Sequence, residues 1–106
     1  GMGQYDVSKA GIVSITRTLA CEEIQHNIRV NAVSPGSTWT SFTSRRAKER
    51  GMTDDELRAE GMMAGGLMNR WADPIEIAYP ILWLSSDEAS FITGAVLMAD
   101  GGFSVR

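Results

Sequence analysis

The sequence contains few of the residues that form disulfides or bind metals. Its 106 residues include one cysteine, Cys21, and one histidine, His26. A single thiol cannot form an internal disulfide, as is expected of a protein from a reducing compartment. Neither residue belongs to a cluster with metal-ligand spacing. These scarcities predict a cytoplasmic protein that has no metal site.

The sequence also lacks the properties of nucleic-acid-binding and membrane proteins. Its net charge is −3 and its pI is near 5.0, which disfavours nucleic acid or an anionic membrane as the main partner. Its apolar runs contain only a few residues, whereas a membrane span needs about 20. Basic residues cluster between Arg45 and Arg50, but a solvated helix face explains that cluster more simply than a binding surface does. We therefore expect no nucleic-acid or membrane partner.

Apolar periodicity predicts both helices and strands. Residues 5–25 form a helix with two apolar stripes, which implies burial on both sides, one against a sheet and the other against a partner subunit. Residues 28–33 are rich in β-branched side chains and predict a strand that ends at the Ser34-Pro35-Gly36 turn. Residues 95–99 are entirely apolar and predict a strand that is buried on both faces.

A further helix is predicted between the two strands. Asp73-Pro74-Ile75-Glu76 is a capping signature with proline at the first helical position. The helix extends to about Ser86, and we expect a kink at Pro80 because proline cannot donate a main-chain hydrogen bond. A strand–helix–strand connection favours a parallel pair of strands with a right-handed crossover.

Residues 37–72 form a long excursion between the first strand and this helix. A polar helix over Ser41–Arg50 is predicted to end at Gly51. Thr53-Asp54-Asp55-Glu56 is a capping box that begins a second helix, which reaches about residue 63 before Gly65-Gly66 interrupts the pattern. Excursions of this length are usually functional lids or disordered segments. We predict a substrate lid, whose apolar lining is offered by Trp39, Phe42, Met62 and Met63.

The fold expected from these elements is α/β, in the order helix, strand, lid helices, helix, strand. A chain of 106 residues permits one small domain, and two strands alone make a poor sheet. Gly1-Met2 has the form of a vector-derived glycine before a start codon, and we expect no secretion leader. We therefore predict a single partial domain over residues 1–106.

Tyr5 and Lys9 are the residues with the clearest chemical potential. They are four positions apart, so their side chains meet on one face of the predicted helix. The ordinary pKa of a tyrosine side chain is about 10, and a nearby ammonium group favours the phenolate and lowers that pKa. Such a pair can act as a general acid and base. Taken alone, the same spacing is more often ordinary packing beside a solvated lysine.

Several segments nevertheless occur in the order and spacing of one known family. Tyr5-Asp6-Val7-Ser8-Lys9 matches the Tyr-x-x-x-Lys element of the short-chain dehydrogenase/reductase family, and Arg29–Gly36 resembles the strand and Pro-Gly turn that follow it. Thr40 falls where the family places a threonine after that turn. Thr93-Gly94 and Asp100-Gly101-Gly102 resemble its C-terminal signature. The chain thus resembles the C-terminal half of such an enzyme, which implies part of a Rossmann-type, doubly wound parallel sheet.

The resemblance implies a role for each matching residue. Tyr5 would transfer a proton to or from an alcohol or carbonyl substrate, and Lys9 would favour its phenolate and hold the nicotinamide ribose. The Pro35-Gly36 turn would pass close to the nicotinamide ring of NAD or NADP. Thr38 and Thr40 would complete the cofactor site, although Thr38 stands where the family often has a branched apolar residue. The hydride chemistry would belong to the cofactor.

The sequence departs from the family by what it lacks. The family holds the cofactor pyrophosphate on a glycine-rich turn between its first strand and helix, and no segment of this sequence has that form. The family's catalytic serine and structural asparagine upstream of the tyrosine are also missing. The resemblance therefore implies an NAD(P)-dependent oxidoreductase. We expect the isolated chain of 106 residues to be inactive.

The alternative is a non-catalytic, truncated member of the family that acts only as an oligomerising module. Its support is the two-striped helix and the missing neighbour of the strand over residues 28–33, whose open edge invites another chain. Under either interpretation we expect a homo-oligomer, and under the alternative a dimer that covers this edge and the helix.

Overall fold

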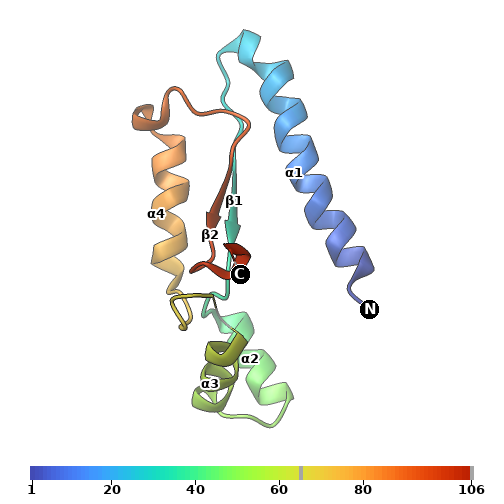
Figure 1. The fold of residues 1–106 in the computed structure, drawn as a ribbon, viewed down its shortest axis with the longest axis vertical. Coiled ribbons are helices and arrows are strands. Elements are labelled where there is room, and N and C mark those ends of the chain that lie inside the picture. Colours follow the sequence, from blue (N-terminus) through green and yellow to red (C-terminus); the bar gives the residue numbers. More distant parts are fainter. Residues whose placement is uncertain (65, 106) are drawn as a thin grey trace. The chain divides into compact units, whose positions relative to one another are not determined.

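A computed structural model describes residues 1–64 and 66–105, apart from the side chains of residues 61–64. The helices are α1 (Gly3–Glu23), α2 (Ser41–Glu49), α3 (Asp54–Ala64) and α4 (Pro74–Ser85), and the strands are β1 (Ala32–Pro35) and β2 (Val96–Ala99) (Figure 1). Short 3-10 turns occupy Ile24–His26, Asp87–Ala89 and Phe103–Val105. The predicted order of helix, strand, two lid helices, helix and strand is confirmed.

The chain divides into two compact units. Unit 1 contains residues 1–33 and 81–97, and unit 2 contains residues 34–80 and the segment from Met98 onward. The division falls inside β1, α4 and β2, so each unit holds part of these elements. That residues 1–106 form one partial domain stays a prediction.

The two strands form a parallel sheet, as the sequence predicted. In unit 1, the main-chain N–H of Ala32 donates to the Ala95 carbonyl at 2.9 Å, and in unit 2 that of Gly36 donates to the Ala99 carbonyl at 3.0 Å. Residue numbers increase together along both strands in these bonds, which is the parallel pattern.

The predicted bounds of the first strand are wrong. Residues 28–31 lie outside β1, which begins at Ala32 and includes Pro35. The reason is that a strand needs a partner, and the ladder with the second strand starts only at Ala95. Upstream, Val30 instead donates to the Thr93 hydroxyl at 3.1 Å and accepts from the Gly94 N–H at 2.7 Å. Pro35 is tolerated at the strand's end because no ladder donor is needed there.

The expectation that residues 95–99 are buried on both faces is also wrong. Val96, Leu97 and Ala99 are half-buried, and Met98 is 47% exposed. The structure describes only two paired strands, and such a sheet has too few neighbouring elements to cover both faces. Apolar composition shows that a strand can be buried. Whether it is buried depends on the elements that pack against it.

Unit 1 is held together by the side chains of Arg29 and Asn31. The Arg29 guanidinium donates to three main-chain carbonyls. One is that of Leu84 near the end of α4, at 2.9 Å, and the others are those of Ser86 at 2.9 Å and Ile92 at 3.1 Å, both after the helix. Asn31 donates to the Ile92 carbonyl at 2.9 Å and accepts from the Ala95 N–H at 3.0 Å. These contacts fix the segment before β1 against the loop that leads into β2.

The two ends of the excursion over residues 37–72, both in unit 2, are joined to each other by main-chain hydrogen bonds. The N–H of Trp39 donates to the Ala72 carbonyl and the N–H of Ala72 to the Ser37 carbonyl, both at 2.9 Å. Between these ends, α2 stops before Gly51, whose φ of +68° suits glycine, as predicted. The break expected at Gly65-Gly66 lies partly outside the described residues, because Gly65 is not among them.

Local side-chain chemistry begins each helix of the excursion. The Thr53 hydroxyl accepts the Glu56 N–H at 3.2 Å and the Glu56 carboxylate accepts the Thr53 N–H at 2.7 Å, which confirms the predicted capping box of α3. The Thr53 N–H in turn lowers the pKa of the Glu56 carboxyl. Thr40 and Thr43 form a second capping box at the start of α2 that the sequence analysis missed.

Aromatic and charged contacts order the excursion. The Trp39 and Trp71 rings meet edge to face with centroids 5.3 Å apart, and the Arg58 guanidinium lies 4.0 Å from the centroid of Trp39. Arg50 of the α2 end bonds the Glu60 carboxylate of α3 at 2.8 Å. In the described residues, α2 and α3 therefore pack against each other.

Candidate functional site

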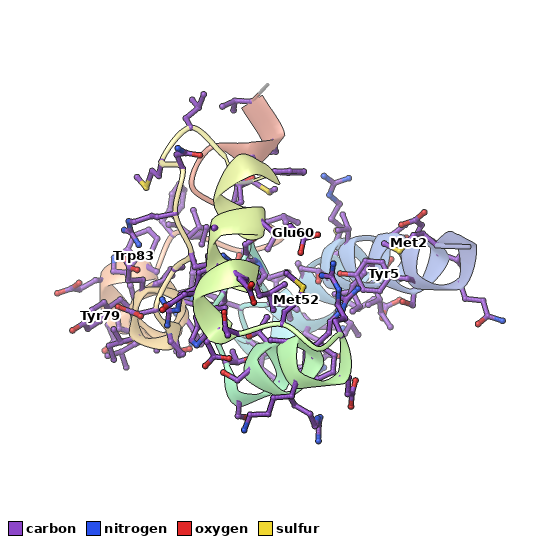
Figure 2. All side chains as sticks on the ribbon, turned by 90° about the horizontal axis from the view of Figure 1, so that it is seen from below. Met2, Tyr5, Met52, Glu60, Tyr79 and Trp83 are labelled. Carbon is purple, nitrogen blue, oxygen red and sulfur yellow. The ribbon has the colours of Figure 1, made fainter. Side chains whose placement is uncertain are left out.

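Tyr5 and Lys9 lie together on the amino-terminal part of α1, as their spacing predicted. The Lys9 ammonium is 5.4 Å from the centroid of the Tyr5 ring, a distance at which a cation interacts with an aromatic face. Tyr5 is 54% exposed, so solvent or a substrate can reach its side chain (Figure 2). The Ser8 hydroxyl donates to the Tyr5 carbonyl at 2.7 Å and stiffens this turn. The structure thus places a cation beside an accessible phenol.

Gly36 is required at the end of β1 by the main chain of Asp100. A β-carbon at Gly36 would lie 2.6 Å from the Asp100 Cα atom and 2.8 Å from the Asp100 carbonyl oxygen. Any side chain here would therefore displace the Asp100 turn, which is reason enough for glycine at this position. That the turn also lies beside a nicotinamide ring, as the resemblance implies, stays a prediction.

The Asp100 turn is itself tightly bonded, in agreement with the Asp-Gly-Gly prediction. The Asp100 carboxylate accepts the N–H groups of Gly102 and Ser104, each at 2.9 Å. Hydrogen bonds from Ser104 lower the pKa of this carboxyl, with a smaller contribution from Gly102. Gly101 and Gly102 have φ values of +63° and +82°, which only glycine adopts at little cost.

The hydroxyls of Thr38 and Thr40 make local contacts within unit 2. Thr38 donates to the Gly36 carbonyl at 3.0 Å. The Thr40 hydroxyl accepts the Thr43 N–H at 3.5 Å and pairs with the Thr43 hydroxyl at 3.1 Å. A hydroxyl carries one donor and two acceptor sites, so the Thr38 hydroxyl, which donates to Gly36, keeps acceptor capacity for a ligand. The part of both threonines in cofactor binding stays a prediction.

A cavity of about 310 Å³ opens beside Gly36 within unit 2. The Asp100–Phe103 turn forms part of its wall, and Arg70 and Glu76 form another part. Its lining therefore combines glycine main chain with one ion pair, and it lies next to the turn that the family resemblance assigns to the cofactor.

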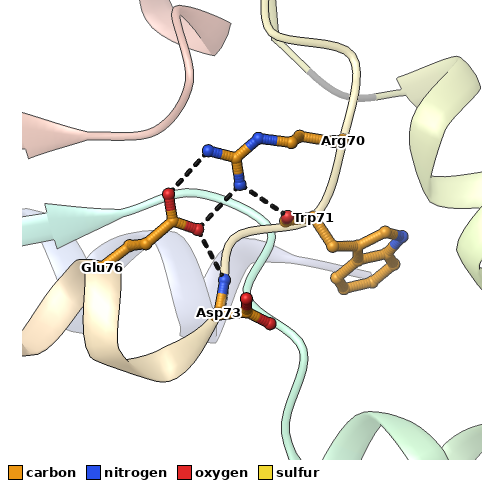
Figure 3. Close-up of polar contacts among 4 residues, drawn as sticks. All are labelled: Arg70, Trp71, Asp73 and Glu76. Carbon is orange, nitrogen blue, oxygen red and sulfur yellow. Dashed lines mark hydrogen bonds and ion pairs between the residues drawn. The ribbon is translucent and has the colours of Figure 1, made fainter.

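Arg70 and Glu76 form a bidentate ion pair at the start of α4 (Figure 3). The two guanidinium nitrogens donate to the two carboxylate oxygens at 2.7 and 2.6 Å, and the Asp73 N–H donates to the same carboxylate at 2.8 Å. The capping role predicted for Glu76 is thus confirmed, whereas Arg70 was missed because no local pattern links it to Glu76. The Arg70 hydrogen bonds, followed by the Asp73 N–H, lower the pKa of the Glu76 carboxyl to about 2.

The Glu76 ion pair gives a pH-dependent prediction. Because the folded pKa lies below the ordinary value of 4.5, the stabilisation is complete above pH 4.5 and is lost as the pH falls through about 2. We expect the NMR shift of the Asp73 amide to titrate in that range, and Glu76→Gln to abolish the transition. The matched variant Glu49→Gln, at the end of α2, should leave it intact. A transition that survives in Glu76→Gln would show that another group controls this amide.

The structure brings the predicted site residues together in two groups. Tyr5 and Lys9 belong to unit 1, whereas Gly36, Thr38 and Thr40 belong to unit 2. Pro35 precedes Gly36 as the last residue of β1. Within each group the residues are neighbours, as the motifs required.

Comparison with known proteins identifies the family. Residues 1–104 match the family model described as enoyl-(acyl carrier protein) reductase. The chain is 41% identical over 104 residues to the short chain dehydrogenase/reductase astE of Aspergillus oryzae, and 38% identical over 105 residues to the 3-oxoacyl-[acyl-carrier-protein] reductase FabG of Thermotoga maritima. The chain belongs to the short-chain dehydrogenase/reductase family.

Solved structures agree with this assignment. The aldohexose dehydrogenase of Thermoplasma acidophilum, a C-terminal deletion mutant, matches the whole chain with a TM-score of 0.89 at 31% identity. The L-sorbose reductase of Gluconobacter frateurii, complexed with NADPH and L-sorbose, matches 93% of the chain with a TM-score of 0.87 at 31% identity. A 4-hydroxyisoleucine dehydrogenase complexed with NADH matches 96% with a TM-score of 0.81 at 31% identity. The predicted partial Rossmann-type fold is confirmed.

The chain spans only part of these relatives. The match to astE covers 98% of this chain but only 38% of astE. The match to FabG covers 99% of this chain but only 39% of FabG. This chain covers 47% of the aldohexose dehydrogenase chain, 39% of the sorbose reductase chain and 40% of the hydroxyisoleucine dehydrogenase chain.

Over the residues that the structure describes, no helix is both long enough and apolar enough to cross a membrane. No group of three or more potential metal ligands occurs within the same residues.

Proposed function

We propose that this chain carries the proton-transfer residues of an NAD(P)-dependent oxidoreductase that interconverts alcohols and carbonyls. Tyr5 exchanges a proton with the substrate oxygen, and Lys9 holds a positive charge beside the phenol. The observation that carries the proposal is the position of the Lys9 ammonium, 5.4 Å from the centroid of an exposed Tyr5 ring, in a chain of this family.

A nicotinamide cofactor fits the second group of residues. The turn from Pro35 to Thr40 offers hydroxyl groups at Thr38 and Thr40, and the cavity of about 310 Å³ opens beside Gly36. When bound, the cofactor supplies or accepts the hydride. Relatives solved with NADH and with NADPH support either form. This chain's own contribution is to position the nicotinamide end and to move the proton.

Sugars and polyols are the substrates to examine first. The matching proteins include a D-arabinitol 2-dehydrogenase of Candida tropicalis, 42% identical over 100 residues, and the sorbose reductase described above. Both names describe alcohol and carbonyl groups on a hydroxylated carbon chain. The two-helix excursion over residues 37–72 is proposed to close over such a substrate.

The proposal is tested by joining this chain to the part of a relative that lies before their match. The amino-terminal segment of Thermotoga maritima FabG, ending where its match to this chain begins, would be fused to Gly1. We expect the fusion to oxidise NADPH or NADH with carbonyl compounds, including L-sorbose. The isolated chain should show no turnover, because its sequence has no glycine-rich turn to anchor the pyrophosphate. No turnover by a folded fusion would contradict the proposal. Turnover by the isolated chain would contradict only the expectation that the pyrophosphate anchor must be supplied by another segment.

A second candidate is a non-catalytic module that self-associates. The exposed apolar side chains of α1, such as Ile15 at 55%, favour it, because a second copy could cover them. It predicts a dimer of the isolated chain at micromolar concentration by light scattering. A monodisperse monomer would contradict this candidate and would leave the catalytic proposal untouched.

A further inference from the structure

The two helices of the excursion border a pocket of about 230 Å³ within unit 2. Two lining residues come from each of three places, namely α2, α3 and the ends of the excursion: Arg46, Arg50, Leu57, Glu60, Ser37 and Trp71. The residues proposed to move the proton or to hold the cofactor are not among them. A concave site that combines an apolar wall with a few polar groups is typical of small-molecule binding.

The pocket carries a surplus of positive charge. Two of its lining residues are arginines and one is a glutamate, so its formal charge is +1. The Arg50 guanidinium bonds the Glu60 carboxylate through both of its terminal nitrogens, at 2.8 and 3.0 Å. This hydrogen bonding is the main cause of the lowered pKa of the Glu60 carboxyl, and the charge of Arg46 makes a smaller contribution. Glu60 is therefore ionised and paired, and the charge left over is that of Arg46.

Donor groups remain available in the pocket. Within the part of the chain that the structure describes, the Arg46 guanidinium has no hydrogen bond or ion pair, and the Ser37 hydroxyl has no partner. Arg50 uses two of its five N–H donors on Glu60, which fixes the orientation of the other three. Guanidinium groups bind carboxylate and phosphate well because their donors match the spacing of two oxygens.

The apolar wall of the pocket is held in place. Leu57 is buried, with an exposed fraction of 6%. The Trp71 Nε1–H donates to the Arg58 carbonyl at 3.0 Å, and the Trp71 ring also meets the edge-to-face partner described above. A fixed ring beside free cations can hold the carbon atoms of a small anion while an arginine binds its charged end.

A solvated helix face, as expected from the sequence, describes only part of the basic cluster on α2. Arg45 and Lys48 are exposed and lie outside the pocket lining. Arg46 lies in the last turn of α2, where a cation also offsets the helix dipole, and its exposure leaves the guanidinium accessible. Neither explanation accounts for a second arginine that Glu60 holds in the same pocket.

We propose that the pocket between α2 and α3 binds the carboxylate or phosphate group of a small organic molecule. Arg46 is the main anchor, and Arg50 and the Ser37 hydroxyl supply further donors. The Trp71 ring covers the carbon atoms of the ligand. The chemistry that both groups share is a negative charge spread over at least two oxygens on one atom. The proposal concerns binding alone, so it does not depend on the proposed oxidoreductase activity.

The test is a titration of the chain at constant ionic strength, followed by the NMR signal of the Trp71 indole N–H. Propionate is the carboxylate probe and ethyl phosphate is the phosphate probe. We expect a saturable shift with at least one of them, and the tighter of the two identifies the preferred group. Propionamide has the same carbon atoms as propionate without the charge and should give no saturable shift. Trp83, which belongs to unit 1 and does not line the pocket, is the internal control.

A matched pair of α2 variants locates the site. Arg46→Met removes the unpaired guanidinium, whereas Arg45→Met removes the same charge one position away, outside the pocket lining. Because each variant lowers the net charge by one, any general attraction of anions falls to a similar extent in both. We expect Arg46→Met to weaken binding about tenfold or more, and Arg45→Met to weaken it less than about twofold.

Three results would overturn the proposal. They are the lack of a saturable Trp71 shift with either anion, an equal shift of the Trp83 indole, and equal weakening by Arg45→Met and Arg46→Met. If the isolated chain gives no dispersed spectrum, the same titration of the fusion with the FabG segment decides, because the Trp71 signal and the two variants report on this pocket. A fusion that binds the anion but turns over no substrate would support this proposal and contradict only the proposed function.

Discussion

Replacing Tyr5 by phenylalanine in the fused enzyme should lower kcat by about 10²–10⁴-fold, the usual worth of a positioned general acid or base. The variant keeps the ring beside the Lys9 ammonium and removes only the hydroxyl that would exchange a proton with the substrate. Tyr5 is 54% exposed, so the loss of one hydroxyl should not disturb folding. The measurement is steady-state turnover with NADPH and a carbonyl substrate.

The matched control for this prediction is Tyr79→Phe. Tyr79 is the only other tyrosine, is 63% exposed on α4, and carries no proposed role. It should retain turnover within about twofold. Binding of NADPH to Tyr5→Phe should also persist, because the phosphate anchor lies in the other part of the fusion. If Tyr5→Phe kept full turnover, Tyr5 would not be the proton donor and the proposed function would fail at its main residue.

Replacing Arg29 by methionine should lower the free energy of unfolding by about 2–4 kcal/mol, since hydrogen bonds to a charged donor are worth about 1.5–3 kcal/mol each and their losses overlap. Three carbonyls on α4 and the following loop depend on this one guanidinium. Methionine retains much of the side chain's apolar length but donates no hydrogen bond. The half-buried position of Arg29 limits how well water can replace the lost donors.

Urea unfolding of the fused protein measures this loss through the shift of the midpoint at constant m. Arg45→Met is the control, since Arg45 is exposed on α2 and lies 5.7 Å from the Phe42 ring centroid in a solvated contact. It should change stability by less than about 0.5 kcal/mol. Equal effects of the two variants would mean that the Arg29 hydrogen bonds add nothing to the fold.

The features that the sequence predicted correctly depend on residues close together in the chain. The Thr53 and Glu56 box, the Glu76 cap and the Asp100 turn each form within a few positions, and all are present in the structure. The same holds for Tyr5 and Lys9, whose four-residue spacing fixes a common helix face. Local chemistry of this kind can be interpreted without knowing what packs against it.

The features that sequence reasoning missed depend on distant partners. Arg29 reaches carbonyls 55 to 63 residues away, and the start of β1 is set by Ala95, so composition alone misplaced the strand. The close approach of the Asp100 main chain to Gly36 was not predicted either, since it joins residues far apart in the sequence. The burial expected for residues 95–99 failed for the same reason, since a strand's exposure depends on neighbours that the strand does not encode.

Cofactor binding tests the central claim most directly, namely that this chain holds the proton-transfer residues of a subunit whose cofactor anchor lies in another segment. NADH and NADPH would be titrated by calorimetry into the isolated chain and into the fusion with the FabG segment. We expect saturable binding of at least one of the two by the fusion and none by the chain alone. Saturable binding by the isolated chain, or none by a folded fusion, would contradict that claim.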